Sequence, residues 1–171
     1  MEPLTRTVRV VTTGSVDVSQ LADVAARTFP LACPASMAPE NIAAFVEANL
    51  SEDRFAEYLA DPHRAVLVAG HDDRIVGYAM LIRGADDDTA ELSKIYVAPE
   101  HHGTGVATAL MDLALATADA WGVGRVWLGV NQANQRAQRF YVKSGFTVSG
   151  TRTFQVGAGR ENDFIMTRAL R

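Results

Sequence analysis

The segment ELSKIYVAPEHHGTGVATALMDL, residues 91–113, decides the fold. Its start alternates as a β-strand does, two glycines follow in a short turn, and a helical pattern of apolar residues begins near Gly105. Gly103 and Gly105 carry no Cβ, so backbone N–H groups there can approach a ligand closely. The unpaired N–H groups and the positive dipole end of the helix point to the same spot. The segment predicts an anion site, for which a pyrophosphate is the natural occupant.

The composition is that of an ordinary globular chain. Its 171 residues are 48% hydrophobic and 21% charged, which suits one domain spanning residues 1–171. A net charge of −4 without a Lys/Arg block argues against a nucleic-acid partner. No run approaches the ~18 apolar residues of a membrane span, and no secretion signal is recognisable, so no membrane partner is expected. The single cysteine, Cys33, excludes an internal disulfide and favours the cytoplasm.

Hydrophobic periodicity predicts antiparallel strands followed by two strand–helix units. The expected strands are 5–13, 65–70, 74–82, 91–97, 125–130, 146–154 and 162–170, with a loop over 84–88. The expected helices are 18–29 (broken by Pro30 and Pro34), one from Pro39 that buries Ile42, Phe45, Val46 and Leu50, a short one after Ser51, one from Gly105 to Gly122, and 133–144. This order predicts a mixed, mostly antiparallel α/β sheet with flanking helices rather than a doubly wound parallel one.

Three interpretations of the glycine turn do not involve a resemblance to a protein family. A Walker phosphate loop requires G-x-x-x-x-G-K-[ST], and no lysine follows the glycines here. The dinucleotide fingerprint G-x-G-x-x-G is missed because Thr108 stands at its third glycine, and Asn131 stands where an acidic residue would follow the next strand. A strand–helix turn that binds no ligand is the third interpretation.

The fourth interpretation rests on a resemblance to the GNAT acetyltransferases. Their acetyl-CoA loop is usually written [QR]-x-x-G-x-[GA], and residues 102–107, HGTGVA, resemble it with Gly105 and Ala107 at the small positions. His102 departs from the usual Gln or Arg. Residues 134–146, NQRAQRFYVKSGF, resemble the family's second signature, N-x-x-A-x-x-[FL]-Y-x-x-x-G-F. Nearly the whole chain is similar to one branch, the bacterial polyamine (spermidine/spermine) N-acetyltransferases of the PaiA kind.

The resemblance implies a GNAT fold and a binding site for acetyl-CoA. In that fold the strand before the loop splays from its neighbour, and the pantetheine arm bonds its free backbone groups, here those of Ile95, Tyr96 and Val97. The residues implied to hold the pyrophosphate are His102, Gly103, Thr104, Gly105, Val106, Ala107 and Thr108. Asn134, Ala137 and Tyr141 share one helical face and are implied to line the ligand. Lys143 is implied to reach a CoA phosphate, unless it is a solvated charge at a helix end.

The implied reaction is direct transfer of an acetyl group from a thioester to a primary amine. Tyr141 is suited to protonate the leaving thiolate, because a phenol with a pKa near ~10 keeps its proton at neutral pH. Glu91 is the candidate base; a strand-edge carboxylate paired with Lys94 or an arginine is the alternative. Period-two alternation places Glu91, Ser93, Ile95 and Val97 on one face.

The sequence leaves open which acceptor is used and whether the protein is an active enzyme. A polyamine leads, and a peptide or protein N-terminus or another small amine such as an aminoglycoside follows. An acidic loop at 84–88 is most simply solvated. A catalytically idle CoA-binding module is the alternative class, although binding alone does not require the Tyr141 phenol. No metal is expected, since adjacent His101 and His102 seldom converge on one ion, and a homodimer is compatible with the family.

Overall fold

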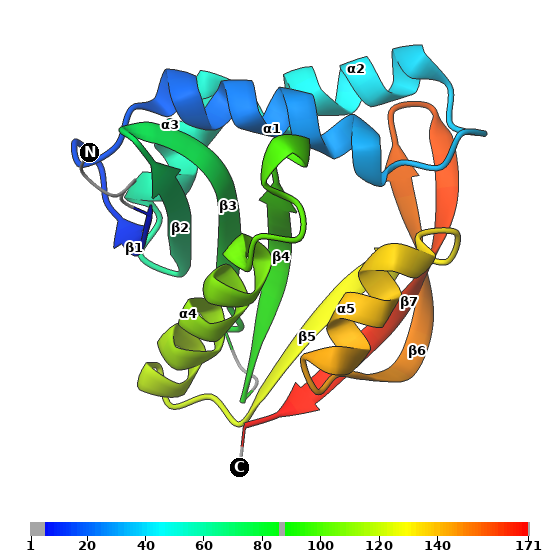
Figure 1. Ribbon diagram of the computed structural model, residues 1–171. Helices are drawn as coiled ribbons and strands as arrows, with labels where there is room; N and C mark the ends of the chain where they lie inside the picture. The colour runs from blue at the N-terminus through cyan, green and yellow to red at the C-terminus, as the bar shows by residue number, and fades with distance from the viewer. Residues whose placement is uncertain (1–5, 86–87, 171) are drawn as a thin grey trace.

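One seven-stranded sheet runs through the molecule in the order β1-β2-β3-β4-β5-β7-β6 (Figure 1). The computed structural model describes residues 6–85 and 88–170. Thr5, at the start of the predicted strand 5–13, and residues 86–87 of the predicted loop lie outside this part of the chain. All neighbouring strands pair antiparallel except β4 and β5, which are parallel. The predicted mixed, mostly antiparallel sheet is therefore confirmed.

The elements follow the predicted order. The strands are β1 (Arg6–Val11), β2 (Arg64–His71), β3 (Arg74–Arg83), β4 (Thr89–Val97), β5 (Arg125–Asn131), β6 (Thr147–Val156) and β7 (Gly159–Ala169). The helices are α1 (Val18–Ala32), α2 (Pro39–Asn49), α3 (Glu52–Ala60), α4 (Val106–Ala120) and α5 (Gln135–Lys143), with a 3-10 turn η1 (Pro99–His101) before the glycine loop.

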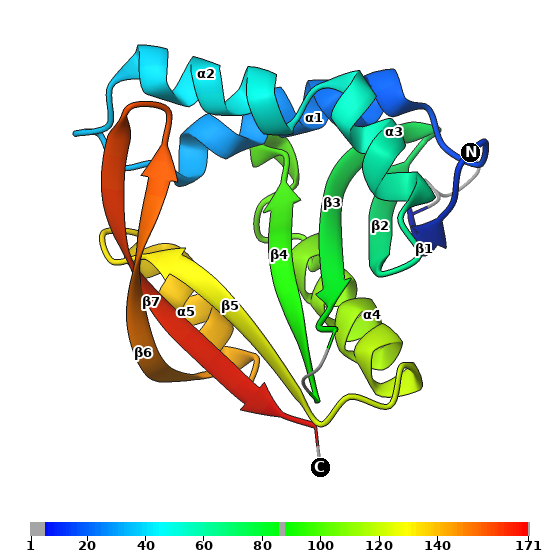
Figure 2. The ribbon, with the colours of Figure 1, turned by 180° about the vertical axis from the view of Figure 1, so that it is seen from behind.

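Helices cover the sheet on both faces and across one end. α4 and α5 lie on one face, α3 lies on the other, and α1 and α2 cross the end to which β4 points (Figures 1 and 2). Two apolar clusters result. The α4 cluster includes Leu92, Val97, Leu110 and Phe146, and the α1–α3 cluster includes Leu21, Phe55, Tyr78 and Leu50. The strands β2 and β3 are thus buried on both faces, whereas β6 is largely exposed, and the end beneath α1 and α2 remains for a site.

The central strands β4 and β5 pair over a short stretch and then diverge. Only Thr89–Glu91 of β4 pairs with Arg125–Trp127 of β5. Beyond this stretch β4 continues beside β3, while β5 continues beside β7, and the two halves of the sheet separate toward α1 and α2 (Figure 2). The predicted splay of β4 is present, and it leaves one edge of its second half without a strand neighbour.

A β-bulge in β4 corrects one prediction about side-chain faces. Met80 of β3 lies opposite Lys94, but the next residue, Leu81, lies opposite Leu92, so Ser93 is an extra residue. A bulge of this kind reverses the alternation of side chains beyond it. Ile95 and Val97 therefore pack in the α4 cluster with Leu92, whereas Lys94 and Tyr96 face the α1–α3 side. The prediction that Ile95 and Val97 share a face with Glu91 was wrong.

The end of α1 also differs from the prediction. The helix was expected to stop at Phe29, yet it continues through Pro30 to Ala32. Proline removes one backbone donor, and two residues from a helix end this costs little beyond a single hydrogen bond. Phe29 stays buried in the α1–α3 cluster, which anchors this turn. The extra turn carries Leu31 and Ala32 over the open end of the sheet.

The second helix is less buried than predicted. Of the four apolar residues expected to be buried, Leu50 is buried at the end of α2, while Ile42, Phe45 and Val46 are half-buried. The helix packs beside α1 and the β6–β7 hairpin rather than flat on the sheet. Its Asn41 side chain accepts a hydrogen bond from the Ala158 N–H at 3.1 Å, which ties α2 to that hairpin. No helix within the described residues is long and apolar enough to cross a membrane.

Two glycines in neighbouring strands give a test of how closely β3, β4 and α4 approach. A Cβ on Gly77 would lie 2.9 Å from the Tyr96 carbonyl oxygen and 3.3 Å from Leu110, whereas one on Gly70 would meet only ordinary contacts from 3.4 Å. We expect Gly77→Ala to lower the free energy of unfolding by about 1–3 kcal/mol through overpacking. Gly70→Ala should change it by less than about 0.5 kcal/mol. Chemical denaturation measures both, and equal stabilities would contradict the close approach.

Candidate active site

The loop before α4 presents backbone N–H groups to the open end of the sheet. Gly103 and Gly105 have φ values of 77° and 87°, in the left-handed region that glycine tolerates. No side chain caps α4, and its first backbone hydrogen bond runs from the Ala109 N–H to the Gly105 carbonyl, at 3.0 Å. The preceding N–H groups of Val106, Ala107 and Thr108 therefore have no partner within the helix. Together with the helix dipole they form an anion site.

The His102 side chain holds this loop to the end of β4. Its Nε2 lies 2.8 Å from the Val97 carbonyl oxygen, and since a carbonyl only accepts, the ring nitrogen donates. His102 thus ties the glycine loop to the end of β4. The neighbouring His101 ring packs edge-on against His71, with 5.2 Å between ring centroids, so the two histidines point to different surroundings.

A first cavity of about 320 Å³ extends from the glycine loop along β4. It runs between α1, β4, the loop and α5. Its lining residues are Thr28, Leu31, Ala32, Ile95, Tyr96, Val97, His101, His102, Gly103, Gly105, Val106, Ala107, Thr108, Asn134, Arg136, Ala137, Phe140 and Tyr141. Most residues predicted to bind a cofactor therefore line one space. Thr104 and the exposed Lys143 do not, and Arg136 is the basic side chain that does.

The start of α5 orients the polar residues of this wall. The Asn134 Oδ1 caps the helix by accepting from the Ala137 N–H at 3.2 Å, which leaves its amide nitrogen as a donor. Tyr141 follows on the same helical face, and its ring packs beside Phe140 and Phe146. Burial raises the pKa of the Tyr141 phenol above its ordinary value, so the hydroxyl keeps its proton. It makes no hydrogen bond with the described residues.

A second cavity of about 410 Å³ lies on the other side of β4 and meets the first. Both are lined by Ala32, Ile95, Tyr96, Asn134, Ala137 and Tyr141. The second is further lined by Phe29, Cys33, Pro34, Met37, Phe45, Asn49, Leu50, Arg54, Tyr58, Arg64, Ile82, Glu91, Ser93, Lys94, Gly129, Val130, Asn131, Arg152, Phe154, Val156 and Asp163. The Tyr141 phenol thus lies where an elongated ligand in the first cavity would meet a compact one in the second.

Glu91 lines the second cavity and forms no ion pair shorter than 4 Å with the described residues. Burial raises the pKa of its carboxyl, and the charges of Arg152, Lys94 and Arg64 oppose that rise. Arg152 is instead paired with Asp163, at 3.1 Å, and the Asp163 side chain is only 5% exposed. Glu91 is therefore a partly desolvated carboxylate that retains capacity to accept a proton.

The described residues were also compared with the requirements of a nucleophilic thiol and of a metal site. Cys33 lines the second cavity, but burial raises the pKa of its thiol to about 11, so it is protonated at neutral pH. Among residues 6–85 and 88–170, no group of three or more His, Cys, Asp or Glu side chains is placed to hold a metal ion. The polar groups that the two cavities do offer, Glu91 and Tyr141, are suited to acid–base chemistry.

Sequence reasoning missed the basic and aromatic residues of the second cavity. Tyr58, Arg64 and Arg152 come from three separate elements, and no local pattern joins them. Lys94 was considered only as a partner of Glu91. One signal was available: Gly129 stands in β5 where a Cβ would collide with the Arg152 guanidinium, so this glycine makes room for that side chain.

Comparison with known proteins defines the class. Residues 25–146 match the Acetyltransferase (GNAT) family, well over half of the chain. An uncharacterized N-acetyltransferase of Mycobacterium tuberculosis (strain ATCC 25618 / H37Rv) is 68% identical over 154 residues, which cover 90% of this chain and 98% of that relative. The chain therefore belongs to the GNAT family and is an N-acetyltransferase. The family expected from the two motifs is confirmed.

Solved structures confirm the GNAT fold. The PaiA N-acetyltransferase of Thermoplasma acidophilum, in complex with coenzyme A, superposes with a TM-score of 0.82 and 21% identity, over 96% of this chain and 99% of that one. The ribosomal-protein-S18-alanine N-acetyltransferase of Escherichia coli gives a TM-score of 0.74 and 21% identity, over 97% and 94%. Proteins named for different acceptors share the fold, so the fold leaves the acceptor of this chain open.

The His102 tie leads to a prediction about the glycine loop. Replacing His102 by Ala removes a hydrogen bond worth about 1 kcal/mol. We expect the hydrogen-bonded amides at the two ends of the loop, those of His101 and Ala109, to exchange about 5-fold faster or more, because local opening becomes easier by that amount. His102→Gln should restore much of the protection, since its amide can donate. The exposed His63→Ala is the control. Unchanged exchange in His102→Ala would show that the loop holds itself in place.

Proposed function

We propose that this GNAT enzyme transfers an acetyl group from acetyl-CoA directly to a primary amine within a ternary complex. The observation that carries the proposal is the meeting of two cavities at Tyr141, one ending in unpaired backbone donors and the other lined by charged side chains. Both substrates can then be bound at once, and no acetylated enzyme intermediate is needed. The Cys33 thiol, whose pKa is raised to about 11, argues against such an intermediate.

The first cavity suits the donor. The pantetheine arm would lie beside Ile95, Tyr96 and Val97, on the edge of β4 that β5 leaves free. The pyrophosphate would accept hydrogen bonds from amides within residues 102–108. Asn134 and Ala137 would contact the arm from α5. For a further phosphate we favour Arg136 over the predicted Lys143, because Arg136 lines the cavity.

The chemical step has a role for each polar group at the junction. The amine nitrogen attacks the thioester carbon, a C–N bond forms, and the C–S bond breaks. Glu91 takes the proton that the amine must lose, directly or through water. A carboxylate with a raised pKa is a better base near neutral pH than an ordinary one. Tyr141 donates its phenol proton toward the departing sulfur, and a backbone N–H near Ile95 is suited to the oxyanion.

An active enzyme is favoured over an idle CoA-binding module. A binding module has no need of an unpaired phenol at the junction of two cavities, nor of a desolvated carboxylate beside it. The acceptor suggested by sequence was a polyamine such as spermidine, with a peptide N-terminus or an aminoglycoside as alternatives. We keep the class of primary amine and set the polyamine aside, because Lys94, Arg64 and Arg54 all line the second cavity. A cytoplasmic enzyme, monomeric or homodimeric, remains the expectation.

The role of Tyr141 can be separated from binding. Tyr141→Phe should bind acetyl-CoA as the wild type does but lower kcat by about 10²-fold, the usual size for general acid catalysis. Calorimetry measures the first quantity, and thiol release from acetyl-CoA the second. Tyr78→Phe is a matched control, because the Tyr78 hydroxyl is buried without a hydrogen bond among the described residues and lines neither cavity. Undiminished turnover in Tyr141→Phe would remove this phenol from the mechanism.

The role of Glu91 has a signature in the pH profile. As a base it acts only when ionised, so the wild-type rate should fall as pH drops through its raised pKa. Glu91→Gln should lower kcat about 10²-fold or more and lose that limb of the profile. The exposed Glu47→Gln on α2 should behave as the wild type. A normal rate and a normal pH profile in Glu91→Gln would show that solvent, and not Glu91, removes the proton.

A further inference from the structure

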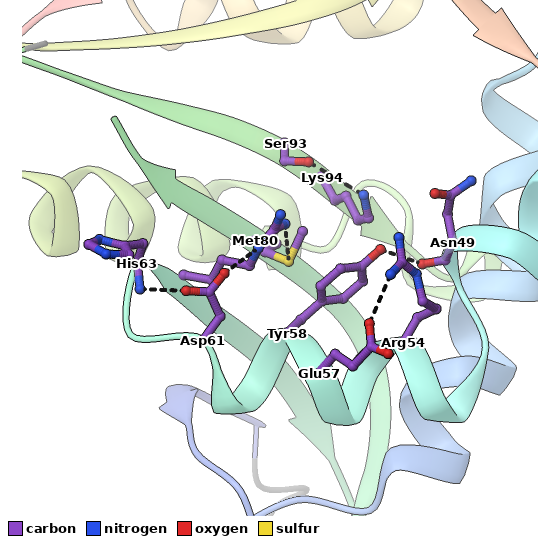
Figure 3. Close-up of polar contacts among 10 residues, drawn as sticks. Asn49, Arg54, Glu57, Tyr58, Asp61, His63, Met80, Ser93 and Lys94 are labelled. Atoms are coloured by element: carbon purple, nitrogen blue, oxygen red, sulfur yellow. Dashed lines mark hydrogen bonds and ion pairs between the residues drawn. The ribbon is translucent and has the colours of Figure 1, made fainter. Parts of the chain in front are cut away.

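Three cationic side chains surround one aromatic ring in the wall of the second cavity. The Arg54 and Arg64 guanidinium carbons lie 5.6 and 4.8 Å from the centre of the Tyr58 ring, and the Lys94 Nζ lies 5.7 Å from it. They come from α3, β2 and β4, and all line the cavity. Figure 3 shows the Arg54 and Lys94 side chains beside this ring. We call Arg54, Arg64 and Lys94 the cation cluster.

The carboxylates that balance the cluster lie outside the cavity lining. Arg54 pairs with Glu57 at 2.8 Å and Arg64 with Asp61 at 3.0 Å, and neither acid is a lining residue. Lys94 has no carboxylate within 4 Å among the described residues; its polar contact is the Ser93 hydroxyl, at 3.4 Å. The side facing a ligand is therefore richer in positive charge than the side facing solvent.

The other charges of the cavity do not cancel this excess. Arg152 and Asp163 neutralise each other as an ion pair, of which only the Asp163 side chain is buried. Among the described residues that line the cavity, Glu91 is the acid left without an ion pair, and the charges that act on it are those of Arg152, Lys94 and Arg64. Within the lining, the cation cluster outnumbers the unpaired carboxylate of Glu91, and Glu57 and Asp61 balance the two arginines from outside the lining. The like charges of the cluster repel one another in a partly dry space.

Two local observations show where a negative group would be stabilised. The Nε of Arg54 is buried and has no hydrogen-bond acceptor among the described residues, a costly state for a donor. Burial, together with the charges of Arg64 and Arg54, lowers the pKa of the Lys94 ammonium to about 8 against the opposing charge of Glu91. An anion between these side chains would accept from the free donor and relieve the repulsion.

We propose that the acceptor is a small primary amine that also carries an anionic group, a carboxylate or a phosphate, and that the cation cluster binds this group while the amine points to Tyr141. The inference rests on the proposed function and names its substrate class. Lys94 and Tyr96 are two residues apart on β4, roughly 7 Å along a strand. Because Tyr96 lines both cavities with Tyr141, the amine and the anion are separated by a chain of a few carbons.

The test compares matched acceptors in the thiol-release assay. Straight-chain ω-amino acids, from glycine to 6-aminohexanoate, are set against diamines and amino alcohols of equal length. Aminoalkyl phosphates form a further arm that distinguishes phosphate from carboxylate. We expect one length of amino acid or aminoalkyl phosphate to exceed its diamine by at least about 10-fold in kcat/KM, because a second ammonium would face the cation cluster.

Variants of Lys94 link this preference to the cluster. Lys94→Met should lower kcat/KM for the anionic acceptor about 10- to 100-fold, the size expected for a lost charged hydrogen bond. The amino alcohol should be little affected. Lys94→Arg should restore the preference, and Arg74→Met, which removes an exposed cation on β3, should leave all rates unchanged.

The pH dependence gives a readout that a purely structural lysine would not. Lys94 is charged below its pKa of about 8, so the preference for the anionic acceptor over the amino alcohol should fall as pH rises above that value. In Lys94→Arg it should persist, because the guanidinium stays charged. The charged groups that act on Lys94 are Arg64, Glu91 and Arg54.

The outcomes separate the inference from the function on which it rests. If acetyl-CoA binds but no anionic amine is acetylated, or a diamine or neutral amine is the better substrate at every length, the inference is wrong and the proposed function stands. The inference is also wrong if Lys94→Met lowers kcat/KM for every acceptor by the same factor. If calorimetry detects no binding of acetyl-CoA, the inference and the proposed function are both wrong.

Discussion

The site depends on the early separation of β4 from β5. Two parallel strands that stayed paired would satisfy each other's backbone groups and close the sheet. Here pairing stops after Glu91, and each strand keeps only its outer neighbour, β3 for one and β7 for the other. The free edge of β4 is costly unless something bonds to it. A ligand bound along this edge would offset the cost, and this edge is where we propose that the pantetheine arm of acetyl-CoA binds.

The cavities on the two sides of β4 handle charge in different ways. The first ends in backbone N–H groups at Gly103 and Gly105, where the polypeptide dipole favours an anion without any charged side chain. The second uses side chains, with acids and bases from α3, β2, β4, β6 and β7. The bulge at Ser93 connects these arrangements, because it turns Lys94 and Tyr96 toward the second cavity while Ile95 stays packed against α4.

Local signals in the sequence predicted most elements of the fold and the residues proposed for the donor site. Residues 102–108 and the helix from Asn134 to Tyr141 were recognisable because close spacing in sequence places them together in a turn or on one helical face. The bulge at Ser93 had no such signal, since strand alternation assumes regular pairing with β3. The passage of α1 through Pro30 was missed for a similar reason: a propensity rule was outweighed by the burial of Phe29.

The sequence by itself determined the class of protein and predicted the residues of the donor half of the site. Strand order, the glycine loop and the tyrosine on α5 are encoded over short stretches. The spacing of residues within such a stretch does not depend on the tertiary arrangement. Only the tertiary structure decided the second cavity. Arg54, Arg64, Lys94 and Arg152 are far apart in the chain, and their shared electrostatic field exists only once the strands and helices bring them within several ångströms of one another.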